Sequence, residues 1–432
     1  MLLVSGVAMA LEIFLLNAAS RYGDFSQQGR ALVFVPLMLL AGAALLAAVG
    51  GFRRVPRPHQ PLALWAFAVA LRMAMILCPP GDDFWRYVWE GRVQHAGHNP
   101  FVHNPRSPEL QYLRDEHWKR INHPESPAIY PPAAQLVFAA LAGVSTAPFC
   151  FKLCFLTADL LTLGLLLRLI GGELRYQRAA WYAWNPAVVY AFTGAAHYDS
   201  LMILALTAAT CALERATRLD ASKPPCGWAT TSSICLGLAI ALKVIPILLL
   251  PVWMFALRSR AWLLSLSVAI PLALTVPFGG LRVVIKPLIS FADVTRFHEL
   301  LVWIFPNPWQ RNWPVTVLLA VSIAFIALRF QDDWRRSALW VLGAVLILSP
   351  VLHPWYATWI LPLAVWRQQS AWTLLSISAL GALLLWETTP YWTAWQPNWI
   401  TRSIVIAPPL LGLAIPLAAQ HLKLPRSGGR SV

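Results

Sequence analysis

Two adjacent aspartates, Asp82 and Asp83, are the residues of this chain best suited to chemistry. They follow the Pro-Pro-Gly turn at 79–81, in a chain that has only 19 acidic residues among 432. A carboxylate within hydrogen-bond reach of a substrate hydroxyl can remove its proton as a general base. The alternative is that Asp82 caps a helix while Asp83 complements its dipole. Because neighbours on a helix point about 100° apart, one aspartate can cap while the other acts on a substrate.

The segment that the aspartates open has the pattern of an amphipathic surface helix. Arg86 follows Asp82 by four residues and precedes Glu90 by four, which is the spacing of helical ion pairs. The helix is expected to end at Gly97, ahead of an Asn-Pro pair. A second surface helix is expected to begin at Ser107-Pro108, where a capping residue precedes a proline at the first helical position.

A proline-rich stretch, 121–135, follows these two predicted helices. Each proline drives the residue before it toward extended backbone, so the stretch should be rigid. His123 and Tyr130 would be held there in fixed positions, as the wall of a polar pocket above the membrane. Both are therefore candidates for substrate binding.

Five further polar residues interrupt apolar surroundings. His197 and Asp199 stand in the turn GAAHYDS, where the alternative to substrate binding is a cap for the next helix. His353 stands in a second short turn, HPWY, where the alternative is a belt of residues at the membrane interface. Lys243 separates two apolar half-helices, so its charge could hold a lipid phosphate or reach the interface by snorkelling. Asp159 lies inside an apolar run, and an acid there serves either function or packing.

The motifs of several common enzyme classes do not occur in the sequence. There is no P-loop, GxGxxG, HExxH or GxSxG pattern, and no long soluble domain that could hold a nucleotide fold. The six cysteines include no CxxC pair and lie in or beside apolar segments, which favours small buried side chains over a metal cluster or disulfide framework. No cofactor is expected.

The composition is that of a membrane protein. The chain is 58% hydrophobic and 12% charged, about half the charged fraction of a soluble domain. Apolar runs of about 16–23 residues recur, long enough to cross a bilayer. We expect an all-α polytopic bundle of about 12–14 membrane segments, with amphipathic surface helices in its first large outward loop. It should form one domain, 1–425, and a disordered cytoplasmic tail, 426–432. The candidate spans lie near 2–19, 31–50, 62–78, 148–170, 177–194, 199–214, 228–242, 245–257, 262–279, 313–329, 336–352, 354–366, 372–387 and 400–420.

The distribution of charge predicts the topology. The net charge of +15 comes from basic residues in short loops between spans, which indicates the positive-inside pattern and not a nucleic-acid partner. The first span has no basic start and no small-residue exit, so it is expected to be retained. The basic turns expected inside are 51–61, 214–223, 257–260, 329–336 and the C-terminal tail. The loops expected outside are 79–130, 194–200, 280–312, 353–356 and 387–399.

Two stretches are too short for ordinary spans. Residues 131–146 are apolar, and only a surface or half-inserted helix there places every basic turn inside, so we favour that interpretation over a span. The pair 228–242 and 245–257 meets at Lys243 and Pro246 and could form a broken hairpin. A polar break at membrane depth must line a cavity or be buried in protein.

The order of these motifs resembles that of GT-C type membrane glycosyltransferases. The chain is most similar to the glycosyltransferase family 87 group and to related bacterial polyprenyl-phosphate-mannose-dependent mannosyltransferases, over about residues 60–370. Three spans precede the acidic motif where the simplest version has one, and we interpret the two extra spans as an added N-terminal hairpin. The motifs that carry the resemblance are GDDFWRYVWEGRVQHAGHNPFVHNP, LRDEHWKRINHPESPAIYPPAAQ, YAWNPAVVYAFTGAAHYDSL, LGLAIALKVIPILLLP and LHPWYATWILPL.

The resemblance implies roles for particular residues. The pattern Asp83-x-x-x-Tyr87 favours Asp83 over Asp82 as the base and makes Tyr87 a substrate-binding candidate. His353 resembles a histidine near the reaction centre. The turn with His197 and Asp199 resembles the motif of the second outward loop, which users of phosphate-linked hexoses employ without a metal.

The implied reaction is an inverting transfer of a hexose, with mannose the expected sugar, from a polyprenyl-phosphate carrier to a hydroxyl of a glycolipid or glycan. It would take place on the outer face of the bacterial cytoplasmic membrane. Polyprenyl phosphate is a good leaving group, so one carboxylate suffices as base, and Lys243, Arg86 or an imidazolium at His353 could stabilise the phosphate.

Two other functional classes remain as alternatives. A transporter or flippase should scatter polar residues at the midplane and show internal repeats, neither of which is present in the sequence. An envelope scaffold would not need an acidic turn beside a proline-clamped loop.

Overall fold

The computed structural model describes residues 2–218, 226–297, 312–388 and 398–421. These residues form α-helices and short 3-10 turns, with one isolated β-bridge and no named strand among them. The predicted all-α class is therefore confirmed. The predicted tail lies outside the described residues, as do parts of the predicted loops 214–223, 280–312 and 387–399.

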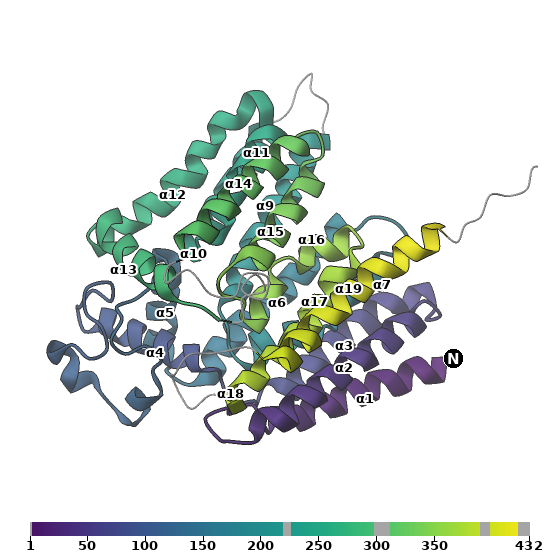
Figure 1. The fold of residues 1–432 in the computed structure, drawn as a ribbon, viewed down its shortest axis with the longest axis horizontal. Coiled ribbons are helices and arrows are strands. Elements are labelled where there is room, and N and C mark those ends of the chain that lie inside the picture. The colour runs from purple at the N-terminus through teal and green to yellow at the C-terminus, as the bar shows by residue number, and fades with distance from the viewer. Residues whose placement is uncertain (1, 219–225, 298–311, 389–397, 422–432) are drawn as a thin grey trace, which may run out of the picture.

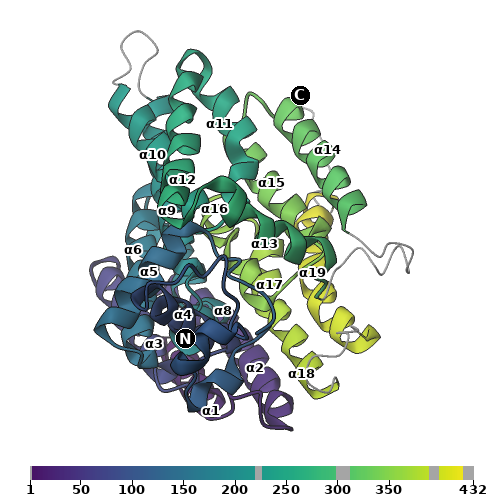
Figure 2. The ribbon, with the colours of Figure 1, turned by 90° about the vertical axis from the view of Figure 1, so that its left-hand side faces the viewer.

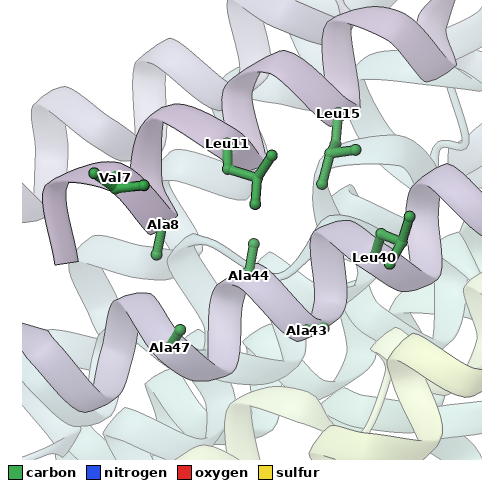
Figure 3. A pocket seen from close by; sticks show the side chains of 8 residues that line it. All are labelled: Val7, Ala8, Leu11, Leu15, Leu40, Ala43, Ala44 and Ala47. Atoms are coloured by element: carbon green, nitrogen blue, oxygen red, sulfur yellow. The ribbon is translucent and has the colours of Figure 1, made fainter. Parts of the chain in front are cut away.

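Three N-terminal helices lie side by side (purple, Figure 1). They are α1 (Leu2–Ser20), α2 (Arg30–Phe52) and α3 (Gln60–Met75). Small residues allow α1 and α2 to approach closely: a Cβ added at Gly51 would lie 2.5 Å from the Cβ of Ser5. Farther along, the two helices leave an open groove of about 510 Å³ (Figure 3). Its lining is apolar throughout and offers a sugar no hydrogen-bonding side chain: Val7, Ala8, Leu11, Leu15, Leu40, Ala43, Ala44 and Ala47.

Helices from the middle and the end of the chain complete the bundle (teal to yellow, Figure 1). They are α6 (Pro148–Leu169), α7 (Arg175–Ala183), α8 (Pro186–Val189), α9 (Asp199–Arg218), α10 (Cys226–Leu242), α11 (Leu250–Leu257), α12 (Ser265–Thr275), α13 (Leu281–Val294), α14 (Trp313–Arg329), α15 (Trp334–Leu348), α16 (Leu361–Trp366), α17 (Ser370–Ser378), α18 (Leu385–Thr388) and α19 (Trp399–His421). In this part of the bundle α9 packs against both α6 and α10, and α19 packs along α17.

The predicted spans coincide with helices or with runs of consecutive helices. Among the described residues, five segments are long and apolar enough to cross a membrane, and five shorter apolar helices accompany them. The long segments are Arg30–Phe52, Pro148–Leu169, Asp199–Arg218, Ile245–Phe278 and Ser370–Glu387. The shorter ones are Ser5–Ser20, Pro132–Val144, Gly227–Leu242, Trp313–Arg329 and Trp399–Ala414. The count of 12–14 membrane segments stays a prediction.

One predicted span, 177–194, is broken in a way that serves the site. α7 ends at Ala183. Asn185 then caps α8, because its Oδ1 accepts the backbone N–H of Ala187 at 2.9 Å and a proline follows it. A π-helical turn, Tyr190–Gly194, then leads the chain into the GAAHYDS turn. There the carbonyl of Ala195 accepts the backbone N–H of Gly81 at 2.9 Å, which ties this turn to the start of the acidic segment.

The loop predicted to face outward, 79–130, and α5 (Pro132–Val144), which follows it, lie against the bundle as two crossed helices and irregular turns. Figure 2 looks onto the side where α4 (Asp82–His95), α5 and α13 lie. α5 has 13 residues, about 20 Å at 1.5 Å per residue, which falls short of a bilayer core and supports the surface interpretation. α4 and α5 cross closely at Gly91, where a Cβ would lie 2.5 Å from the carbonyl oxygen of Phe138.

The structure corrects the second predicted surface helix. The chain from 108 to 120 forms two 3-10 turns, Pro108–Leu113 and Glu116–Arg120, and not one α-helix. Asp115 separates them because its backbone is extended and its side chain accepts the N–H of His117, which starts the second turn afresh. The predicted end of α4 is confirmed: Gly97 follows it with a φ of +80°, a conformation that favours glycine.

A buried ion pair and a tyrosine hydroxyl connect three helices, α3, α6 and α7, in the interior of the bundle. Arg72 of α3 donates to Asp159 of α6 at 2.7 Å, and the second oxygen of Asp159 accepts the hydroxyl of Tyr182 at 2.8 Å. Neither Arg72 nor Asp159 is exposed. The two possibilities for Asp159 are thereby decided in favour of packing, because its charge is satisfied within the core.

Loops that are predicted to lie on the same side of the membrane contact one another in the structure. On the basic side, Arg335 pairs with Glu214 at 2.6 Å and Arg260 reaches the carbonyl of Ala216 at 3.4 Å. On the other side, Asn99 donates to the carbonyl of Phe278 at 2.7 Å. Loops predicted to share a side thus contact one another, and the aspartates lie with the second group.

Candidate active site

The two aspartates lie in the first turn of α4, and neither caps it. The N-cap is Gly81, and no side chain makes a capping hydrogen bond there. Both carboxylates are instead bound by one amide: Asn122 Nδ2 lies 3.1 Å from Asp82 Oδ2 and 2.8 Å from Asp83 Oδ1. The capping alternative is therefore wrong for the side chains, although both charges still complement the helix dipole.

Arg86 holds the proline-rich loop against α4. Its Nε donates to Glu90 at 2.8 Å. Its two terminal nitrogens donate to four backbone carbonyls, those of residues 122, 123, 126 and 127, at 3.1, 2.8, 2.6 and 2.8 Å. A guanidinium has five N–H groups, so every donor is used within the protein. Arg86 is only 3% exposed. The structure thus gives Arg86 a positioning role and leaves no donor free for a phosphate.

Aromatic rings form the inner wall beneath the aspartates. Tyr87 is buried, with its ring stacked on Phe138 at 4.4 Å and edge-on to Tyr130 at 5.2 Å and Tyr198 at 5.5 Å. Tyr130 also helps to stabilise the ionised form of Asp83 by a hydrogen bond, which lowers the pKa of that carboxyl. Tyr130 thus contacts Asp83 directly, whereas Tyr87 packs among the rings of the wall.

The GAAHYDS turn brings two predicted residues to the aspartates. His197 is 1% exposed, and its Nδ1 lies 3.6 Å from Asp83 Oδ2, slightly beyond hydrogen-bond distance. Asp199 Oδ1 accepts from Lys243 Nζ at 2.6 Å and from Trp359 Nε1 at 2.7 Å. Burial and the charge of Lys243 hold the pKa of His197 well below its usual range, so its ring is neutral at pH 7.

Lys243 is held in an aromatic cage at the predicted break. α10 ends at Leu242 and the chain resumes as a 3-10 turn at Ile245–Leu249, which confirms the broken element. The ammonium of Lys243 lies 5.3 Å from the ring centre of Tyr198, 4.6 Å from that of Tyr356 and 4.7 Å from that of Trp359. Rings at this distance attract a cation through their π faces. With a side chain that is 14% exposed, Lys243 is buried in protein and does not snorkel.

A ladder of stacked rings connects His353 to the aspartates. His353 stacks on Trp355 with ring centres 4.5 Å apart, and His197 stacks on Trp355 at 3.7 Å. Burial, followed by the charge of Lys243, lowers the pKa of His353 to about 3. The structure therefore corrects the expectation of an imidazolium: His353 is a neutral ring that can donate a hydrogen bond but supplies no positive charge.

His123 stands at the rim of the same group. Its φ of +44° lies in the left-handed region, which is uncommon for a residue other than glycine and indicates local strain. Its side chain is 42% exposed and its ring packs edge-on to Phe291 of α13 at 5.2 Å. The structure places His123 in the irregular chain between the 3-10 turn Glu116–Arg120 and α5, as the surrounding prolines predict; its role in substrate binding stays a prediction.

Burial and mutual repulsion perturb the ionisation of the two aspartates. Burial, with the neighbouring charge of Asp83, raises the pKa of Asp82 to about 7. Burial also raises the pKa of Asp83, against the opposing effects of Asn122 and of the positive charge of Lys243. The two carboxyls therefore titrate as a coupled pair, and the charge of Lys243 favours ionisation of Asp83. Two carboxyls in unequal electrostatic surroundings suit acid–base chemistry.

The described residues include no group of three or more His, Cys, Asp or Glu side chains placed to hold a metal ion, and their cysteines form no disulfide. The charges of Asp199 and Lys243 both act on Asp83. The ammonium of Lys243 binds the Asp199 carboxylate, so it takes the place that a metal cation would have beside this carboxylate. In this arrangement, the carboxylate of Asp83 can accept a proton from a substrate hydroxyl, close to the positive charge of Lys243.

The structure thus joins all ten predicted site residues through contacts or close electrostatic interactions. Sequence reasoning missed Asn122, although it directly precedes His123 in the rigid stretch, and it missed the cage and ladder rings. The only sequence signal for these rings was that each of the short turns GAAHYDS and HPWY, which are predicted to face outward, contains aromatic residues. The missed residues are Asn122, Tyr198, Trp355 and Trp359. Tyr356 was singled out with His353 in the turn HPWY, but not as part of a cage around Lys243.

Comparison with known proteins adds one finding. A family model described as "Alpha-(1->6)-mannopyranosyltransferase, N-terminal domain" matches residues 4–259. This range includes α1 to α11 and therefore both aspartates, Asn122, the GAAHYDS turn and Lys243. His353 and the rings around it lie beyond the matched range. A search of curated proteins finds no match to the chain.

Proposed function

Because this chain belongs to the alpha-(1->6)-mannopyranosyltransferase family, we propose that it moves a mannosyl group from a polyprenyl-phosphate carrier to a hydroxyl of a glycolipid or glycan. We further propose that the transfer inverts the anomeric carbon and occurs on the outer face of the bacterial cytoplasmic membrane. An inverting transfer that forms an alpha linkage needs a donor with the opposite, beta configuration. Membership of a transferase family favours chemistry over the transporter and scaffold alternatives.

The observation that carries the mechanism is the pair of aspartates beside the caged lysine. Asp83, ionised, accepts the proton of the acceptor hydroxyl as the oxygen attacks the anomeric carbon of the sugar. The bond from that carbon to the phosphate oxygen breaks, and its electron pair leaves with the polyprenyl phosphate. The proton ends on the Asp83 carboxylate and returns to water after the product departs. No further acid is required, because the phosphate is a stable anion.

Lys243 supplies the positive charge in this proposal. Its ammonium is fixed by Asp199 and by three rings, so it can stabilise the departing phosphate without reorganising. Its charge also opposes the burial that raises the pKa of Asp83 and so favours the ionised form of the base. The neutral rings of His197 and His353 are positioned to donate hydrogen bonds to phosphate or sugar oxygens.

The outward placement of the site is supported by the basic turns gathered at the opposite end of the bundle. A lipid-linked donor would enter from the bilayer, and the Trp and Tyr side chains around Lys243 suit that depth.

Sugar transfer from labelled polyprenyl-phosphate mannose, in membranes that contain the protein, tests the proposal. Asp83→Asn should lower the rate by about 10²–10⁴, the usual worth of a general base, and Asp82→Asn should remain far more active. The matched control is Asp115→Asn, an exposed acid of the same loop that pairs with Arg92. Equal activity of wild type and Asp83→Asn would refute the mechanism. If only Asp82→Asn were inactive, the assignment of the base would move to Asp82.

A further inference from the structure

The side chain of Asn122 occupies a position between two charges that no apolar residue could fill. It is 6% exposed. The amide nitrogen of an asparagine carries two hydrogens, and here its two acceptors are Asp82 at 3.1 Å and Asp83 at 2.8 Å. Each aspartate therefore receives one hydrogen bond from the same nitrogen.

The backbone that presents Asn122 is fixed by the helix that carries the aspartates. Arg86, one turn after them on α4, donates to the carbonyl of Asn122 itself and to three more carbonyls of the loop. Glu90, one turn farther, accepts from Arg86. The strained backbone of His123 lies between two of these hydrogen bonds. The helix α4 thus determines the positions of both aspartates and of the loop whose Asn122 bridges them.

We propose that Asn122 is a positioning residue that holds the two carboxylates in a fixed relation and favours their ionised forms, with Arg86 as the clamp that keeps it there. The proposal rests on the proposed role of Asp83 as the base. An amide N–H only donates, so it stabilises a carboxylate more than a carboxylic acid, and Asn122 lowers the pKa of both aspartates.

The other groups around the pair act unequally on its two members. Lys243 and Tyr130 favour ionisation of Asp83, while Asp199 disfavours it. Among the described residues, Asn122 alone hydrogen-bonds to both side chains. Charged and titratable groups face the pair from several elements. Among the described residues they include Lys243, Asp199, Glu90, His123, His197, Tyr87, Tyr130, Tyr190, Tyr198 and Tyr356.

Infrared titration of the purified protein in lipid nanodiscs tests the proposal without relying on turnover. The carboxylic acid band of the pair is identified by its change in Asp82→Asn and in Asp83→Asn. In Asn122→Ala, we expect the midpoint of that band to move up by roughly one pH unit from its position near 7, because one charged hydrogen bond to each acid is lost. The acid limb of the pH–rate profile should move in the same direction.

The matched control is Asn99→Ala in the same loop. Asn99 also makes two hydrogen bonds, donating to the carbonyl of Phe278 and accepting the N–H of Phe101, but touches neither aspartate. It should leave the band midpoint where it is. An unchanged midpoint in Asn122→Ala, or an equal shift in Asn99→Ala, would overturn the proposal. If the midpoint moves while Asp83→Asn still transfers sugar, the proposal for Asn122 as a bridge stands and the assignment of the base fails.

Discussion

Replacing Asp82 by asparagine should make the folded protein more stable at alkaline pH. Burial and the charge of Asp83 raise the pKa of Asp82 from 3.8 to about 7. Because the folded-state pKa lies above the unfolded one, folding favours the protonated form, and stability falls as the pH rises toward and through about 7. Asn122 can still donate to the amide oxygen of the new asparagine, so the variant removes the charge and keeps the bridge.

The magnitude follows from the shift in pKa. At about 1.36 kcal/mol per pH unit, a change from 3.8 to about 7 corresponds to about 4 kcal/mol. Asp82 is half-buried, and screening by water reduces this to about 2 kcal/mol. The full effect should appear at about pH 9, where wild-type Asp82 is ionised, and most of it should disappear at about pH 5.

Thermal unfolding in detergent at about pH 5 and about pH 9 measures this difference. The quantity of interest is the stability of Asp82→Asn relative to wild type, compared between the two pH values. Asp115→Asn is again the control, since Asp115 is exposed and pairs with Arg92 across the surface. If Asp82→Asn gave the same stability difference at both pH values, or a larger advantage in acid, the reasoning about burial and repulsion at the pair would be refuted.

Three further changes test other parts of the structure. Arg86→Lys should lower transfer and shift the pH–rate profile as Asn122→Ala does, because one ammonium cannot donate to four carbonyls at once; a normal profile would argue against the clamp. Lys243→Met should destabilise the protein by about 3–5 kcal/mol because it leaves Asp199 buried without its cation. The double variant with Asp199→Asn should regain the melting temperature but not sugar transfer. Recovered transfer in the double variant would remove Lys243 from the mechanism. Gly91→Leu should destabilise the α4–α5 crossing by roughly 1–3 kcal/mol through overpacking, whereas a melting temperature equal to that of wild type would show that the crossing is looser.

The sequence by itself determined the class of the fold and most of the polar residues of the site. Long apolar runs fix helices in a membrane, because a backbone without water must bond to itself. In a chain with 12% charged residues, the few acids and histidines outside the runs stand out, and Asp83, His197, Asp199 and His353 were found in this way. The break at Lys243 was also visible, because a charge followed by a proline interrupts an apolar run.

Only the tertiary structure decided what these residues do to one another. Asn122 lies about 40 positions from the aspartates along the chain, and no local pattern marks an amide whose partners are that distant. Arg86 was one of three candidates to stabilise a phosphate, yet its five donors are used by the protein, because folding brings four loop carbonyls and Glu90 to it.

The charge state of His353 could not be predicted from the sequence either, because it depends on contacts with distant residues. An imidazole in a short turn is expected to be near its ordinary pKa, whereas burial between rings and beside Lys243 keeps it neutral. Residue types and their order along the chain are local properties that the sequence states directly. Burial and the distances between charges depend on which distant segments meet, and these quantities set the ionisation and the free hydrogen-bond donors of the site.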